Sequence, residues 1–285
     1  MNVERVLAHK FGNVVQTYDV RDTLFYALSV GAGGDPVDPV EQRFVFERNL
    51  VALPTQSAVL CHPGPWGADP AFEIDLPRIL YAQQHMELHR PLPVSGRVRG
   101  CEKIVGLVDK GASKGVLMTL RRDLVDDATG EPLATLHATT MLRGDGGCGV
   151  TLGSTQAPHA VPDRAPDRRT EFATLPQLAL LYRLNGDMNP IHADPDLARK
   201  LGFERPILHG LCSYAVAALA LIETWCVGDA TQLRSLGVRF TAPLYPGETL
   251  VVESWGDGST LSFRALSKER GVKVLDNGVA EVGWK

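Results

Sequence analysis

Residues 210–226 read GLCSYAVAALALIETWC and form the most apolar stretch of the chain. Ala and Leu are strong helix formers, and Pro206 and His209-Gly210 lie where such a helix can begin. Four runs rich in strand-forming residues follow, with the turn sequences Tyr-Pro-Gly, Asp-Gly and Arg-Gly between them and Asn-Gly within the last run. These runs are residues 235–241, 249–255, 261–266 and 272–282. One apolar helix followed by an antiparallel run predicts an α+β domain in which a sheet wraps round a helix.

The same plan occurs earlier in the chain, at a constant difference of 156 in residue number. Identical pairs at this offset include Leu24 and Leu180, Tyr26 and Tyr182, Leu28 and Leu184, Asp38 and Asp194, Pro39 and Pro195, and Ser57 and Ser213. Further on, Pro91-Leu92 and Pro243-Leu244 each open a strand pair at an offset of 152. A length of 285 residues fits two domains of ordinary size. We therefore predict a duplicated fold.

A linker separates the two predicted domains, residues 1–153 and 170–285. Residues 154–169, STQAPHAVPDRAPDRR, contain three prolines and no apolar periodicity. The halves differ in their central helix, because the stretch after Leu53 meets Pro63-Gly64-Pro65 and a helix must stop there. The N-terminal domain is therefore predicted to have a truncated central helix and space inside its sheet.

The composition limits the classes of protein to which this chain can belong. With 44% hydrophobic and 22% charged residues, the chain has the composition of a soluble globular protein. The net charge of −4 argues against nucleic acid as the main partner. The five cysteines form no CxxC pair, so we expect reduced thiols and no zinc site. There is no signal peptide, no stretch able to span a bilayer and no Ser-Lys-Leu ending, which favours the cytoplasm.

Residues 182–192, YRLNGDMNPIH, hold the strongest candidate for chemistry. Asp187 and His192 lie five residues apart in a turn, because Pro190 prevents a continuous helix and Gly186 permits tight backbone approach. A rigid turn of this kind can direct an acid and an imidazole at one water for general acid–base catalysis. The positions equivalent to these two residues in the first half are Gly31 and Pro36, so only the second half is predicted to be catalytic.

Two other interpretations of this turn stay open on spacing alone. In the first, Asp187 and Asn189 are helix caps or turn-formers and His192 is an exposed structural histidine. In the second, Asp187, His192 and Asp194 bind a metal ion, which the lack of a second nearby imidazole or cysteine cluster disfavours. The start of the apolar helix at His209-Gly210 offers free N–H groups to an oxygen that gains negative charge, or is a helix start and nothing more.

A family resemblance bears on this choice. Residues 182–217, YRLNGDMNPIHADPDLARKLGFERPILHGLCSYAVA, closely resemble the active-site stretch of the MaoC-like, R-specific enoyl-CoA hydratases of the hydratase 2 type. The similarity continues through residues 238–250, VRFTAPLYPGETL, and upstream through DKGASKG and LVALPTQ. It covers nearly the whole chain and implies a double hot-dog fold, two antiparallel sheets that each surround a helix.

The resemblance also implies roles for the candidate residues. Asp187 and His192 would activate the water that adds across a trans-2-enoyl thioester and gives the (3R)-hydroxyacyl product. In this reading His192 is the base toward water and Asp187 gives a proton to C2. The Gly210 N–H would polarise the thioester carbonyl, and Asn189 would brace the site. The binding residues implied for coenzyme A are Lys110, Arg239, Phe240 and Tyr81.

The chain departs from the family pattern in two places. Residues 81–84, YAQQ, stand where a His-Gly-Glu-Gln type stretch usually contacts the ligand, which puts the contacts along the coenzyme A arm in doubt. Asn185 stands where Ser is commoner. In this family a first domain without a full central helix makes room for the acyl tail, so the resemblance implies medium- to long-chain or branched substrates in fatty acid metabolism such as β-oxidation.

The implied protein needs no cofactor and no metal, since the coenzyme A thioester is itself the substrate. A homodimer is expected, because hot-dog folds usually pair. Four other functions stay possible at this point: a dehydratase acting on acyl carrier protein, a specialised hydroxyacyl-CoA dehydratase, a hot-dog thioesterase, and a non-catalytic acyl-CoA-binding protein.

Overall fold

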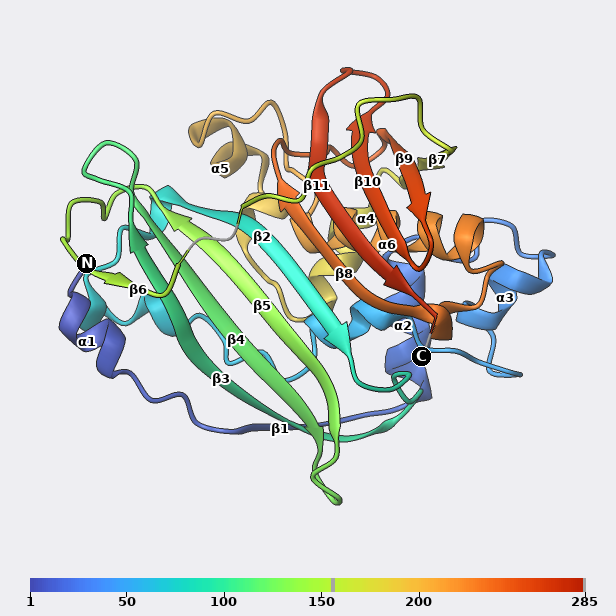
Figure 1. The fold of residues 1–285 in the computed structure, drawn as a ribbon, viewed down its shortest axis with the longest axis horizontal. Coiled ribbons are helices and arrows are strands. Elements are labelled where there is room, and N and C mark those ends of the chain that lie inside the picture. The colour runs from blue at the N-terminus through green and yellow to red at the C-terminus, as the bar shows by residue number, and fades with distance from the viewer. Residues whose placement is uncertain (155–156, 284–285) are drawn as a thin grey trace.

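The computed structural model describes residues 1–154 and 157–283 (Figure 1). The strands of the first half are β1 (Val14–Tyr18), β2 (Ile79–Leu88), β3 (Gly96–Asp109), β4 (Val116–Asp126), β5 (Pro132–Leu142) and β6 (Thr151–Leu152). Those of the second half are β7 (Arg168–Ala173), β8 (Leu233–Phe240), β9 (Thr249–Asp257), β10 (Thr260–Ser267) and β11 (Lys273–Val282). All four strands expected in the second half are thus confirmed, with their ends shifted by no more than two residues. Together the strands form one 11-stranded antiparallel sheet.

The order of strands in this sheet shows the duplication. It runs β1-β3-β4-β5-β2-β8-β11-β10-β9-β7, with β6 beside β3, so the two halves mirror each other about the β2–β8 junction. At that junction His85 pairs with Gly237, and these are equivalent positions under the second offset of the repeat. Tyr26 and Tyr182, an identical pair of the repeat, pack with their ring centroids 6.4 Å apart. The predicted repeat is confirmed, and its equivalent residues meet at the boundary between the halves.

The helices differ between the halves as predicted. The central helix α6 (Gly210–Trp225) is buried from Cys212 to Ile222 and lies against the second half of the sheet (Figure 1). Its equivalent in the first half is only the 3₁₀ helix Pro54–Ala58. The other α-helices are short: α1 (Val3–Ala8), α2 (Val20–Ser29), α3 (Pro39–Val45), α4 (Leu178–Tyr182) and α5 (Pro195–Lys200). Within the described residues, no helix has the length and apolarity needed to cross a membrane.

Arg122 of β4 holds the segment that replaces the missing helix. Its guanidinium donates to the carbonyl oxygens of Leu60, at 2.7 Å, and Ala58, at 3.2 Å. The 3₁₀ helix Pro54–Ala58 is itself buried, so it fills part of the interior that the missing helix leaves. The first half therefore has a short, anchored segment where the second half has four turns of helix.

The predicted linker lies on the second half of the sheet. His159 is 2.7 Å from the Ser262 hydroxyl and its carbonyl accepts a hydrogen bond from Asn277, so this segment crosses β10 and β11 (Figure 1). The Trp255 indole donates to the Ala165 carbonyl oxygen at 2.9 Å. Strand β7 then begins at Arg168, two residues before the predicted domain start. Two residues of the predicted linker, 155 and 156, lie outside the described residues.

Asn185 joins the two halves beside the candidate turn. Its amide donates to the hydroxyl of Ser29 at 2.7 Å, and Ser29 is fully buried in α2. We expect Asn185→Ala to lower the free energy of unfolding by about 1 kcal/mol, because Ser29 loses a partner that water cannot replace. Urea denaturation of Asn185→Ala, Ser29→Ala and the double variant measures the coupling between the two side chains. Strictly additive losses would show that the hydrogen bond contributes nothing.

Candidate active site

The turn that carries Asp187 and His192 is built from short-range hydrogen bonds. Gly186 has φ +114°, a left-handed conformation that favours glycine, and it ends the 3₁₀ turn Arg183–Asn185. The Asp187 carboxylate then accepts from the Asn189 N–H, and the Asn189 side chain accepts from the Ile191 N–H, both at 3.2 Å. Asp187 and Asn189 are therefore turn-formers, as one interpretation held, but this role leaves the Asp187 side chain exposed.

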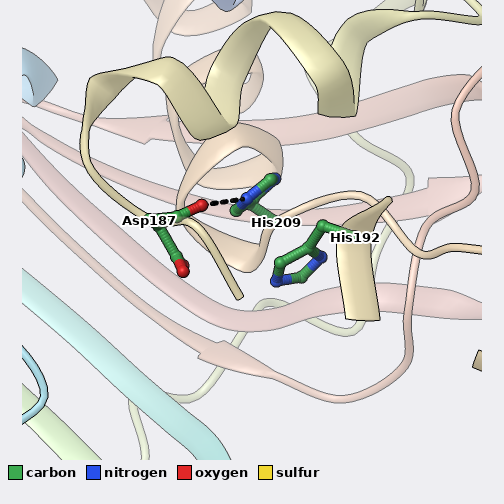
Figure 2. A group of neighbouring side chains, drawn as sticks. All are labelled: Asp187, His192 and His209. Atoms are coloured by element: carbon green, nitrogen blue, oxygen red, sulfur yellow. Dashed lines mark hydrogen bonds between the residues drawn. The ribbon is translucent and has the colours of Figure 1, made fainter. Parts of the chain in front are cut away.

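The turn brings an acid and two imidazoles together. A carboxylate oxygen of Asp187 and ring nitrogens of His192 and His209 all lie within 4.8 Å of one another (Figure 2). The interpretation of His192 as an exposed structural histidine is wrong, since only 8% of it is exposed. Spacing in sequence predicted the meeting of Asp187 and His192, and the structure adds His209 to them.

The hydrogen bond and the burial of His192 would suit its imidazole to act as a base. Its Nδ1 lies 2.8 Å from the Ile207 carbonyl oxygen, and a carbonyl can only accept, so in the neutral ring Nδ1 carries the proton and Nε2 the lone pair. Burial lowers the pKa of His192 from its usual value. The imidazole is therefore neutral near pH 7, with a nitrogen able to take a proton from water.

His209 is the member of the site that the sequence did not reveal. It is 1% exposed, and its ring stacks on that of His192 with centroids 3.6 Å apart and planes 25° apart. Its Nε2 lies 3.2 Å from the Asp187 carbonyl oxygen (Figure 2). Burial, and then the nearby His192, lower the pKa of His209 to about 4. The signal in the sequence was its place directly before Gly210, at the predicted start of the apolar helix.

The geometry favours proton transfer over metal binding. Asp194, the third member of the proposed metal set, instead caps α5 by accepting from the N–H groups of Asp196 and Leu197. Asp187, His192 and His209 are close enough to share an ion. However, the lone pairs of two stacked rings lie in nearly parallel planes, whereas ligands of one ion must converge on it.

The N-terminus of α6 borders the site at Gly210. No partner for the Gly210 N–H is found among the described residues, as is usual for the first turn of a helix. A Cβ at Gly210 would lie 3.2 Å from the Phe240 ring, which accounts for glycine here. Phe240 in turn packs edge-on against Tyr81, with centroids 5.4 Å apart, and the Tyr81 hydroxyl donates to Gln84 at 2.6 Å. Two of the expected binding residues, Phe240 and Tyr81, therefore lie together beside Gly210.

The two expected cationic ligands lie on other elements. Lys110 is exposed in the turn between β3 and β4, and Arg239 is exposed on β8 at the junction with β2. Exposure suits a cation that meets a phosphate group of a bound ligand. Their assignment to a coenzyme A groove stays a prediction.

Both halves of the chain match known protein families. An MFE-2 hydratase 2 N-terminal domain model matches residues 16–144, and a MaoC like domain model matches residues 157–278. A peroxisomal enoyl-CoA hydratase 2 from Arabidopsis thaliana is 37% identical over 96% of this chain and 93% of its own. The chain belongs to the MaoC-like hydratase 2 family. Similar members include a 3-hydroxyacyl-thioester dehydratase Y from Mycobacterium tuberculosis, 40% identical over 92% of this chain and 91% of that protein.

Solved structures of the family share the fold. A MaoC-like dehydratase from Phytophthora capsici superposes with a TM-score of 0.86 and 33% identity over the whole of both chains. The peroxisomal multifunctional enzyme type 2 from Drosophila melanogaster superposes with a TM-score of 0.81 and 29% identity, over 95% of this chain and 48% of its own. A further Mycobacterium tuberculosis protein, described as having a double hot-dog fold, superposes with a TM-score of 0.57 and 14% identity over 96% of both chains, which confirms the double hot-dog prediction.

The first half of this hydratase 2 family member has no second copy of the site. Gly31, the equivalent of Asp187, has φ +90°, and a Cβ there would lie 2.9 Å from the Phe172 ring. An acidic side chain at this position would therefore clash with the second half. This packing, together with Pro36 at the position equivalent to His192, leaves one copy of the candidate turn in the chain.

The buried His209 makes stability depend on pH. Unfolded His209 takes up a proton near pH 6.5, but the folded residue does so only near pH 4. The unfolded state binds more protons in that window, so the free energy of unfolding falls as pH drops, by roughly 2 kcal/mol at pH 5 from this residue. We expect urea denaturation at pH 7, 6 and 5 to show this loss and His209→Gln to show less of it. Equal pH dependence in the two proteins would contradict the prediction.

Proposed function

We propose that this chain is an (R)-specific 2-enoyl-CoA hydratase, a hydro-lyase that adds water reversibly to trans-2-enoyl-CoA. The observation that carries the proposal is a ring nitrogen of the buried His192 within 4.8 Å of an Asp187 carboxylate oxygen, beside the free N–H groups at the start of α6. The relatives named enoyl-CoA hydratase 2 and 3-hydroxyacyl-thioester dehydratase support the same chemistry.

The reaction uses the two side chains as one unit that holds a single proton. His192 Nε2 takes a proton from water as the water oxygen bonds to C3 of the enoyl group. The electrons of the C2–C3 double bond move toward the thioester carbonyl, and the proton passes from His192 to Asp187, which donates it to C2 and leaves both side chains as they began. Because both groups lie on one side of the substrate, the hydroxyl and the proton arrive on the same face.

The carbonyl oxygen gains negative charge during this step, and Gly210 is placed to stabilise it. Its N–H has no partner among the described residues and lies at the positive end of the four-turn helix α6. A hydrogen bond that strengthens as the charge develops lowers the barrier without tightening substrate binding. Asn189 supports the site by fixing the turn on both sides of it.

The substrate is proposed to carry a medium- to long-chain or branched acyl group. The support is the first half of the fold, where the 3₁₀ helix Pro54–Ala58 replaces a helix of 16 residues and leaves less side-chain volume inside the sheet. The coenzyme A arm is proposed to cross Phe240 and Tyr81 at the β2–β8 junction toward Lys110 and Arg239. No cofactor takes part in these steps.

A chain-length series tests the proposal. We expect loss of enoyl absorbance with C4 to C16 trans-2-enoyl-CoA, a higher kcat/KM at C10 than at C4, and only the (3R) product on chiral analysis. A (3S) product, or release of free thiol, would refute the proposed function. Faster turnover of the C4 substrate would refute the acyl-chain proposal while leaving the hydratase function in place.

The same chemistry run in reverse is the second candidate, favoured by the relative named a 3-hydroxyacyl-thioester dehydratase. Rates with (3R)-hydroxyacyl groups on coenzyme A and on acyl carrier protein separate the two carriers.

We further propose a cytoplasmic homodimer. Light scattering on the purified protein tests the oligomer, and imaging of a fluorescent fusion tests the location.

A further inference from the structure

We propose that His209 is a positioning residue for this reaction, which holds Asp187 through its backbone carbonyl and supports the ring of His192 from one face. The inference rests on the proposed hydratase function and assigns a task to a residue outside the acid–base pair. His209 does not need to touch the substrate for this task, because both of its contacts are with groups that do.

The hydrogen bond to Asp187 fixes an otherwise exposed turn. Gly186, Asp187 and Met188 are all exposed, so little side-chain packing holds the carboxylate in place. The His209 Nε2–H donates to the Asp187 carbonyl oxygen at 3.2 Å and so ties the turn to the first residues of α6. Since Gly210 follows His209 directly, one residue sets the position of the acid relative to the carbonyl-binding N–H.

The stack on His192 fixes the base in the same way. With centroids 3.6 Å apart and planes 25° apart, the His209 ring covers one face of His192 and keeps water from it. The Ile207 carbonyl holds the His192 ring at Nδ1. The ring of His192 therefore has a fixed orientation, with Nε2 left for the reacting water.

His209 can do this only as a neutral ring with its proton on Nε2. The groups that face it are Asp187, His192, Arg183 and the ring of Tyr182, which lies 4.9 Å away. Its Nδ1 is buried and has no hydrogen-bond partner among the described residues, so a second proton there would have no acceptor. Since burial holds the pKa of His209 at about 4, the ring stays neutral even when His192 takes a proton from water.

Two substitutions separate this role from simple packing. His209→Gln places an amide N–H near the position of Nε2 but removes the ring, whereas His209→Phe keeps a stacked ring and removes the donor. We expect His209→Phe to lower kcat by about 10- to 100-fold with KM changed less than about threefold, because a shift of the acid by a fraction of an ångström is costly. His209→Gln is expected to keep kcat within about threefold to tenfold of the wild-type value. The reverse ranking would show that the stacked ring matters and the hydrogen bond does not, which would overturn the proposal that His209 holds Asp187.

Nitrogen NMR of the wild-type protein tests the same idea without turnover. We expect His209 to show the Nε2–H tautomer and no titration above pH 5. A proton on Nδ1, or titration near pH 6.5, would overturn the proposal even in an active enzyme. A wild-type protein that hydrates no enoyl thioester would refute the proposed function and the catalytic task of His209, while the NMR result would still show whether His209 holds Asp187. The two failures are therefore distinguishable.

Discussion

Asp187→Asn and His192→Gln are each expected to lower kcat by roughly 10²-fold or more, within the range for general acid–base groups. Asparagine keeps an oxygen that can accept from the Asn189 N–H, so Asp187→Asn preserves the turn and removes only the ability of this side chain to transfer a proton. Glutamine at position 192 has no basic nitrogen, so His192→Gln removes the proposed base. Steady-state kinetics with a C10 enoyl-CoA measures both effects.

A matched control and a double variant test whether the loss of kcat comes from these two side chains acting together. His89 is exposed and bonds to Thr135, so His89→Gln removes an imidazole without touching the site and should keep wild-type kcat. The double variant Asp187→Asn, His192→Gln should lose little more than either single variant, because the two side chains act on one proton as a unit. Near-normal turnover in both single variants would remove these residues from the chemistry.

The parts of the fold with strong local patterns were predictable from sequence. The apolar run that became α6 and the four strands after it carry helix and strand composition within their own residues. The repeat was visible because its constant spacing includes Asp38-Pro39 and Asp194-Pro195. In the structure each aspartate is the N-cap and each proline the first residue of a short helix, α3 or α5. Identical pairs thus marked equivalent local structure.

Strands β1 and β7 were not predicted, for a physical reason. Both are edge strands of the sheet, and each pairs with a strand that is distant in the sequence, β1 with β3 and β7 with β9. Residues 168–173, RRTEFA, are mostly polar and continue the charged composition of the linker. Their strand conformation comes from non-local pairing with β9, which no local pattern records.

The site was predicted in part for a similar reason. Spacing placed Asp187 and His192 in one turn, but spacing is equally compatible with a turn that has no chemistry, and the family resemblance decided between them. His209 is separated from His192 in the chain by the whole of α5, and only the packing of the turn on the start of α6 brings the two rings together. The sequence therefore predicted that Asp187 and His192 lie together and did not reveal that His209 joins them.

Gly210→Pro is expected to lower kcat by about 10²- to 10³-fold, roughly 3–4 kcal/mol of barrier, with little change in KM. Gly210 is the first residue of α6, a position at which proline fits a helix because its N–H has no partner within the helix. The preceding residue, His209, has φ −58° and ψ 135°, an extended conformation that proline favours in the residue before it. The substitution therefore removes the N–H proposed to bind the carbonyl oxygen and leaves the helix able to form.

Gly210→Ala is the matched control for this variant. Both substitutions add a Cβ 3.2 Å from the Phe240 ring, so both require the same small movement of that ring, but alanine keeps the N–H. We expect Gly210→Ala to retain most of the wild-type kcat and the two variants to melt within a few degrees of each other. If the alanine variant lost as much activity as the proline variant, the cause would be crowding against Phe240. The alanine variant keeps the N–H and the proline variant replaces it with the ring Cδ, so the ratio of their kcat values reports the loss of this donor at a matched Cβ contact.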